Sequence, residues 1–231
     1  MYWSKVWDRI LPTKCAVCGQ LPSPCCSGCE PTARPFKVTR GDTSVAVAAQ
    51  LNPAISTLIT EFKDKGQLAL ANSLTQLCSA ALELELRGLQ FEFGAETASL
   101  AIAWVPSSRA AQRRRGFDAN GHLLRKTMQW RKREGLAIFP LVSTLRHIAR
   151  NRDQSGLSRE DRFTNASGSF VAIGRPRRLL LFDDILTTGA TLGSALAALR
   201  LANFQVAGCF ALAETPLRAT SVGASRIVHV G

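Results

Sequence analysis

The stretch LLLFDDILTTGATL, residues 179–192, sets the expectation for the fold. Its first four residues are continuously apolar, which is typical of a central strand in a parallel sheet. Asp183 and Asp184 follow at the expected carboxyl end of that strand, and the chain then turns into a helical pattern. Ligands of open α/β sheets bind at the carboxyl ends of strands. The stretch therefore predicts a strand, a polar site and a helix in succession.

The turn before the helix has the chemistry of a phosphate site. The N-terminus of a helix presents free backbone N–H groups and the positive end of the helix dipole. Hydroxyl side chains and a flexible glycine lie at this turn, which consists of Thr187, Thr188, Gly189, Ala190 and Thr191. A sugar phosphate fits, with its phosphate in the turn and its hydroxyls on the two carboxylates. The Gly-Lys-Ser/Thr ending of a Walker loop is missing. An ordinary capped helix is the alternative, but it explains one of these residues rather than the whole string.

The rest of the chain alternates between strand and helix patterns. We expect strands at residues 44–51, 99–106, 177–184, 206–213 and 226–230, and helices at 52–66, 67–86, 118–134 and 190–203. This alternation predicts an α/β protein whose mostly parallel sheet is flanked by helices. The Pro-rich, basic residues 31–42 are interpreted as a linker. We therefore divide the chain into a zinc-binding segment with linker at residues 1–40 and a main domain at residues 41–231.

Four of the seven cysteines have the spacing of a metal site. Cys15 and Cys18 form one Cys-x-x-Cys pair, and Cys26 and Cys29 form a second. Two such pairs can supply four thiolates to one tetrahedral zinc ion in a closed, structural site. Cys25 is an alternative to Cys26 as the third ligand. A redox pair or disulfides would also account for the pattern, but we interpret it as a small zinc knuckle without a catalytic role.

Composition indicates a globular protein with a concentrated basic region. The net charge of the 231 residues is +12, and residues 104–178 hold 17 Lys and Arg against 5 Asp and Glu. Such a field attracts phosphates, diphosphates or nucleic acid; a solvated basic surface is the alternative, but the confinement of the excess to one segment favours anion binding. The apolar runs are far shorter than the roughly 18 residues of a membrane span. The N-terminus also lacks an apolar signal core, so we expect a cytoplasmic protein without a membrane span.

Residues 179–192 resemble the motif by which type I phosphoribosyltransferases bind 5-phosphoribosyl-1-pyrophosphate (PRPP). The resemblance implies that residues 187–191 hold the 5′-phosphate and that Asp183 and Asp184 hold the ribose hydroxyls and steady positive charge at C1′. It also implies a Mg²⁺ ion that bridges diphosphate and ribose oxygens. The stretch VPSSR follows a predicted strand, as the family's pyrophosphate loop does, and would supply Ser107, Ser108 and Arg109.

The chain as a whole is similar to the ComF family of phosphoribosyltransferase-like proteins, which is linked to DNA uptake. The similarity includes the cysteine pairs, FKDKG, RRRGFDAN and NRDQSGLSREDRFTN. It implies that Lys63 faces the pyrophosphate. Asp118 and Ala119 depart from the Asn-Gln that the family often has after Gly-Phe. The basic residues that would bind nucleic acid or substrate, the latter from a hood over the site, are Arg113, Arg114, Arg115, Arg150, Arg152, Arg159 and Arg162, with Gln154.

Three functions are compatible with these features. The first is a ComF-type phosphoribosyltransferase that binds PRPP with Mg²⁺. The second is a non-catalytic competence factor that binds single-stranded DNA through its basic residues and through the aromatic residues Phe117, Trp130 and Phe163. The third is a scaffold that senses PRPP without turnover. The expected partners are PRPP, and for a role in competence also single-stranded DNA and other DNA-uptake proteins.

Overall fold

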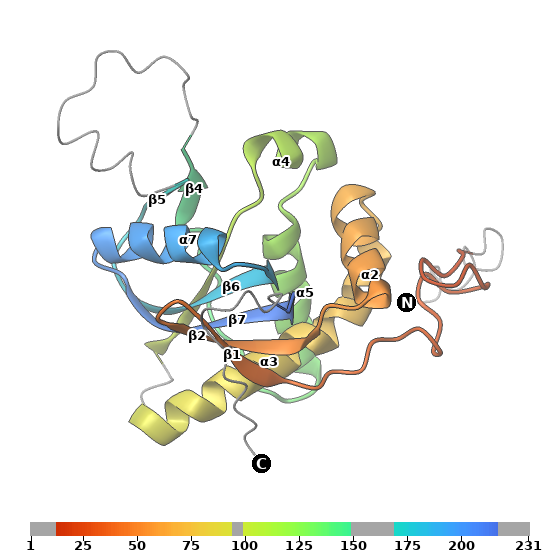
Figure 1. Ribbon diagram of the computed structural model, residues 1–231, viewed down its shortest axis with the longest axis horizontal. Coiled ribbons are helices and arrows are strands. Elements are labelled where there is room, and N and C mark those ends of the chain that lie inside the picture. Colours follow the sequence, from red (N-terminus) through yellow and green to blue (C-terminus); the bar gives the residue numbers. More distant parts are fainter. Residues whose placement is uncertain (1–12, 94–98, 149–168, 217–231) are drawn as a thin grey trace, which may run out of the picture.

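Five strands form the main sheet of the protein, for which a computed structural model describes residues 13–93, 99–148 and 169–216 (Figure 1). The strand order is β1-β2-β7-β6-β3. Neighbours from β2 to β3 are parallel, and only β1 runs antiparallel to its neighbour. The expected mostly parallel sheet is therefore confirmed. The strand bounds are β1 Phe36–Arg40, β2 Thr43–Gln50, β3 Ala101–Trp104, β6 Arg178–Leu186 and β7 Gln205–Glu214.

Helices cover both faces of this sheet. Figure 1 shows α7 on one side and the long α3 on the other. The α5 helix packs against α3, and α2 lies beyond the strand ends. The bounds are α2 Pro53–Asp64, α3 Ala71–Phe93 after a 3₁₀ turn at Leu68–Leu70, α4 Arg109–Arg115, α5 Ala119–Arg133 and α7 Ala190–Leu201.

The start of α2 illustrates how the sequence specifies these helices. Asn52 caps the helix, because its Oδ1 accepts the backbone N–H of Ile55 at 2.9 Å. Pro53 occupies the first helical position, where a missing N–H has no consequence. The apolar face that follows ends at Phe62, which is buried. The chain then leaves the helix through Gly66, whose φ is +68°. This cap and apolar face fix the direction of the helix end that carries Lys63.

Side chains along β6 alternate between two hydrophobic cores. Leu180 and Phe182 belong to the core under α2, α3 and α5. Leu179 and Leu181 belong to the core under α7. Because successive residues of a strand point to opposite faces, this alternation places the next two residues on opposite faces as well. Asp183 is therefore expected on the α7 side and Asp184 on the α2 side.

Several elements differ from the sequence-based expectation. Strand β1 lies within residues 31–42, which we interpreted as a linker, because it pairs with β2 along its whole length. Helix α4 and the antiparallel pair β4 Leu145–His147 and β5 Phe170–Ala172 were not predicted, since each is too short for a periodic signal. The strand expected at residues 226–230 lies outside the described residues.

Candidate phosphate and metal sites

Both aspartates of the predicted site lie inside β6. The strand continues to Leu186, two residues beyond the expected end at residue 184, so the acids lie before its end rather than at it. They are also buried, with 6% of Asp183 and 7% of Asp184 exposed. Lys63, at the end of α2, forms an ion pair with Asp184. Asp183 instead accepts the backbone N–H of Asp184 at 2.9 Å. The pair is thus partly satisfied by the protein itself, and among residues 13–93, 99–148 and 169–216 its cationic partner is Lys63, on the α2 side.

The two carboxyl groups differ in their affinity for protons. Burial and the neighbouring charge of Asp184 raise the pKa of Asp183 well above its usual range. Burial also acts to raise the pKa of Asp184, but the ammonium of Lys63 outweighs it and lowers that pKa. Two carboxylates so close together disfavour simultaneous ionisation. Asp183 is therefore the member of the pair that holds a proton more readily, and Asp184 the one that ionises more readily.

The predicted phosphate loop follows directly after these acids. Residues 187–189 form the turn, and α7 begins at Ala190. Thr187, Thr188, Ala190 and Thr191 are exposed, and Gly189 adopts the left-handed φ of +84°. The Ala190 N–H points back to Thr188 Oγ1 at 3.3 Å. An exposed turn at a helix N-terminus thus lies next to the buried acid pair.

One residue that contacts this loop was missed in the sequence. Arg40, the last residue of β1, is buried and pairs with Glu214 at the end of β7. Its Nε donates to the carbonyl of Thr187 at 2.9 Å. The segment TRGD around Arg40 carries no local signal for this role, because the contact joins residues 147 positions apart.

The predicted pyrophosphate loop lies beside the end of β6. The N–H of Val105, just after β3, donates to the carbonyl of Phe182 at 2.9 Å. Ser107 follows in the loop, and Arg115 Nη1 donates to its hydroxyl at 3.5 Å. The same arginine pairs with Asp64 at 2.7 Å. Since Asp64 is the neighbour of Lys63, the end of α2 contacts both the acid pair and the loop after β3.

Ser108 and Asp118 hold the loop after β3 in place. Ser108 caps α4, because its hydroxyl accepts the N–H of Ala111 at 3.2 Å. Asp118, which departs from the family pattern, accepts a hydrogen bond from the indole of Trp104. The Ser107 N–H also points at Asp118 Oδ1, at 3.5 Å. Asp118, where this chain differs from the family pattern, is therefore a residue that holds the loop after β3 in place.

Basic residues of α4 lie on the surface around this loop. Arg109, Arg113 and Arg114 are exposed, and Arg109 and Arg113 line a hollow of about 460 Å³ together with Phe117. Phe117 also packs against Phe62, with ring centroids 5.9 Å apart. The remaining predicted basic residues, with Gln154 and Phe163, lie outside the described residues; these are Arg150, Arg152, Arg159 and Arg162.

A larger hollow, of about 920 Å³, lies elsewhere. It is bounded by the cysteine segment (residues 13–35), by β1 and by the start of α2, with Cys29, Phe36 and Ile55 among its lining residues. None of the residues predicted to bind PRPP lines it. The larger hollow is therefore not the predicted PRPP site. The candidate site is the acid pair with the loop that follows it.

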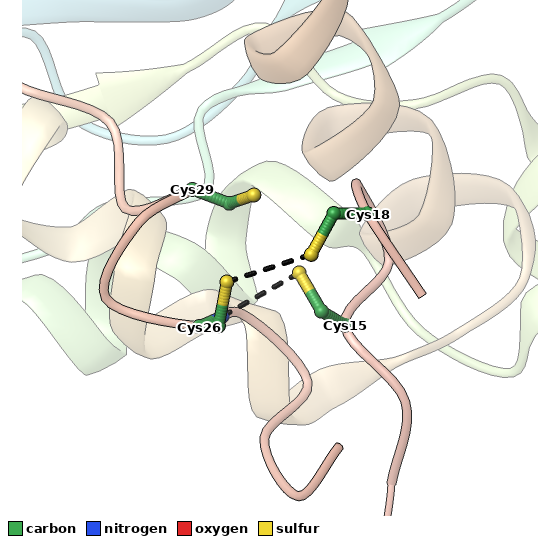
Figure 2. A group of neighbouring side chains, drawn as sticks. All are labelled: Cys15, Cys18, Cys26 and Cys29. Carbon is green, nitrogen blue, oxygen red and sulfur yellow. Dashed lines mark hydrogen bonds between the residues drawn. The ribbon is translucent and has the colours of Figure 1, made fainter. Parts of the chain in front are cut away.

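The four predicted metal ligands converge in space (Figure 2). Their four Sγ atoms all lie within 4.8 Å of one another; the residues are Cys15, Cys18, Cys26 and Cys29. A tetrahedral zinc ion with Zn–S bonds of about 2.3 Å separates its sulfurs by about 3.8 Å. The sulfurs of Cys18 and Cys26 are 3.6 Å apart. The four cysteines can therefore hold a structural metal ion such as zinc.

The pKa values of the cysteine thiols also favour a bound cation in this cluster. Burial acts to raise the pKa of Cys15, but hydrogen bonds from backbone N–H groups outweigh it and lower that pKa to about 6. Hydrogen bonds with the thiols of Cys26 and Cys18 raise the pKa of Cys29. Four adjacent thiolates thus require a positive ion at their centre. Cys25, the alternative ligand, is buried in the main core instead, where burial raises its pKa to about 11.

Among residues 13–93, 99–148 and 169–216, no helix is long and apolar enough to cross a bilayer.

Comparison with known proteins agrees with the motifs. No protein-family model matches the chain. The chain is 30% identical over 156 residues to Competence protein F of Haemophilus influenzae. The match covers 65% of this chain, and it spans 63% of the length of that relative. This similarity agrees with the resemblance to the ComF family that the cysteine pairs and the 179–192 stretch carry.

Proposed function

We propose that this protein binds PRPP with Mg²⁺ at the acid pair and the adjoining loop, and transfers its phosphoribosyl group to an acceptor. One observation carries the proposal. A buried acid pair and an exposed turn at a helix N-terminus are consecutive in the chain and adjacent at one edge of the sheet. Burial of two neighbouring carboxyl groups is unfavourable for folding. Their presence is explained if they bind a ligand.

The two halves of the site match the two ends of a pentose phosphate. The backbone N–H groups and hydroxyls of residues 187–191 would bind the 5′-phosphate. Asp183 and Asp184 would accept hydrogen bonds from the 2′- and 3′-hydroxyls. A bound Mg²⁺ ion prefers carboxylate and phosphate oxygens, which this site and its ligand would offer together, and it would neutralise charge on the diphosphate.

Lys63 would link the ribose to the diphosphate. It pairs with Asp184 and lies one residue from Asp64, which contacts the loop after β3 through Arg115. The ammonium thus lies at the acid pair, and the next residue of the helix contacts the loop that carries Ser107 and Ser108, the predicted diphosphate ligands, through Arg115. When PRPP binds, the lysine can exchange its carboxylate partner for a diphosphate oxygen.

The transfer itself requires stabilisation of charge at C1′. The bond from C1′ to the diphosphate oxygen breaks, and its electron pair leaves with the diphosphate. The acceptor nucleophile then forms the new bond at C1′. Positive charge on the ribose is greatest between these events, when a fixed carboxylate nearby lowers the energy of the transition state. The ionised Asp184 would provide that charge.

A role in competence follows from the relative's name, and DNA binding is the second candidate function. The exposed Arg109, Arg113 and Arg114 on α4 favour contact with a polyanion. Phe117 is less suited to stacking on bases than expected, because it packs against Phe62 and His122. Binding of DNA through α4 would be compatible with PRPP binding, and so would a role as a PRPP sensor without turnover.

A diphosphate-release assay separates these functions. The protein is incubated with PRPP, Mg²⁺ and a mixture of nitrogenous acceptors, and released diphosphate is measured. We expect release by the wild type and by Asp42→Asn, an exposed-acid control. We expect none from Asp183→Asn/Asp184→Asn. Stabilisation by PRPP without release would favour the sensor. Salt-sensitive binding of single-stranded DNA without any response to PRPP would favour the second candidate.

A further inference from the structure

The loop of residues 187–191 rests on a buried arginine. Only 7% of Arg40 is exposed. Its guanidinium pairs with Glu214 and donates to the carbonyl of Thr187 at 2.9 Å. Two further bonds, each 3.2 Å long, run to the carbonyls of Thr39 and Thr215. One side chain thus joins β1, the end of β7 and the turn before α7.

We propose that Arg40 is a positioning residue for phosphate binding, an inference that rests on the proposed function of the loop. In a trans peptide, the carbonyl and the N–H of the next residue point in opposite directions. Among the described residues, the only cis bond precedes Pro22, so the peptide between Thr187 and Thr188 is trans. Because Arg40 holds the Thr187 carbonyl on the buried side, it turns the Thr188 N–H away from itself, toward the exposed side. That is the side on which the 5′-phosphate would bind.

The aliphatic part of Arg40 also fixes the path of the loop. A Cβ atom added to Gly189 would lie 2.8 Å from Cβ of Arg40. Gly189 also has a φ of +84°, which side-chain-bearing residues rarely adopt. A side chain at position 189 would therefore collide with Arg40, so this close contact at the start of α7 requires a glycine.

Orientation rather than charge is the effect we assign to Arg40. Glu214 is 4% exposed, and its carboxylate neutralises the guanidinium. Glu214 is itself fixed, because its carbonyl accepts the N–H of Leu51 at 2.8 Å. A buried, neutralised arginine attracts a phosphate weakly, but it can hold the N–H groups that bind one.

Arg131 provides a matched control. It is fully buried and pairs with Glu83 at 2.7 Å, and it also binds Ser79, so that it links α5 to α3. With a third bond to the carbonyl of Ala137, it donates three hydrogen bonds against the four of Arg40, so its replacement disturbs the protein to a similar extent. None of its bonds involves the 187–191 loop. A loss of phosphate binding that follows from general destabilisation would appear in both variants.

The experiment compares Arg40→Met/Glu214→Met with Arg131→Met by calorimetric titration of ribose 5-phosphate, without Mg²⁺, at a temperature where each variant is folded. We expect Arg40→Met/Glu214→Met to bind ribose 5-phosphate about tenfold more weakly than wild type, and Arg131→Met to bind it with wild-type affinity. The amide resonance of Thr188 should shift on addition of ribose 5-phosphate in the wild type and in Arg131→Met. It should shift less in the double variant.

A second variant covers the case in which the double variant does not fold. In Arg40→Lys the charge beside Glu214 remains, but a single ammonium cannot serve both that carboxylate and the Thr187 carbonyl in the fork geometry of arginine. We expect Arg40→Lys to bind ribose 5-phosphate less tightly than wild type. Wild-type affinity in either Arg40 variant would overturn the positioning role while leaving the proposed function intact. A wild-type protein that does not bind ribose 5-phosphate would instead overturn the phosphate site itself.

Discussion

At the scale of single residues, Asp183 and Asp184 show opposite adaptations to burial. Asp184 stays ionised because Lys63 reaches it from α2. Asp183 forms no such ion pair within the part of the chain that the structure describes, and its pKa is raised by burial and by the charge of Asp184. Adjacent positions in a strand point to opposite faces, so Lys63, which pairs with Asp184, offsets the burial of Asp183 only in part. The protein therefore folds with a carboxyl group that is poorly matched to its surroundings, as binding sites often are.

Asp183→Asn is expected to stabilise the protein at neutral pH. The folded-state pKa of Asp183 is raised above the unfolded value, so the folded protein binds more protons than the unfolded chain. Its stability therefore decreases as pH rises from about 4 toward that raised pKa. The asparagine removes this dependence and should add about 1 kcal/mol to the free energy of unfolding at pH 8. Urea denaturation at pH 5 and pH 8 measures both effects. An unchanged pH dependence would contradict the assignment.

Lys63→Met is expected to destabilise the protein by about 1–2 kcal/mol, because it leaves the buried carboxylate of Asp184 without its cation. Lys65→Met is the matched control. Lys65 is exposed and pairs with Glu61 at 2.6 Å on the surface of the same helix end, so its loss should change stability by less than about 0.5 kcal/mol. Thermal denaturation at pH 7 compares the two. Equal effects would show that the Lys63–Asp184 pair is an ordinary surface contact.

At the scale of elements, the start of α7 depends on its glycine. Gly189→Ala places a Cβ where φ is +84° and 2.8 Å from Arg40. We expect a loss of about 1–3 kcal/mol in stability. Gly193→Ala is the control in the same helix, since nothing lies within 4 Å of the added Cβ. It should stabilise the protein by about 0.5–1 kcal/mol through helix propensity. Chemical denaturation measures both, and a neutral Gly189→Ala would contradict the described turn.

The cysteine segment is the second element whose chemistry can be isolated. Purified protein should contain one tightly bound zinc ion, and Cys18→Ala should lose it, because three thiolates close the tetrahedron incompletely. Cys25→Ala should keep the ion, since Cys25 faces the main core. Elemental analysis of the two variants measures the metal content. Retention by Cys18→Ala together with loss by Cys25→Ala would reassign the ligands.

At the scale of the whole molecule, local patterns predicted the elements and long-range contacts arranged the site. The apolar run 179–182 predicted β6, and the cysteine spacing predicted a cluster that the structure brings together. The contact of Arg40 with the loop was not predictable, because it depends on β1 lying beside β2 and on β7 lying next to β6. The burial of the acid pair was missed for a similar reason. Strand length beyond Asp184 is set by pairing with β7, and the sequence alone does not show it.

The central claim is that the acid pair and the adjoining loop form one site for PRPP. Its most direct test is calorimetric titration of the wild-type protein with PRPP in the presence of Mg²⁺, repeated with Asp183→Asn/Asp184→Asn. We predict saturable binding by the wild type and at least about tenfold weaker binding by the double variant, as loss of charge-assisted hydrogen bonds requires. Equal affinity in both proteins, or no binding by the wild type at millimolar PRPP, would contradict the claim.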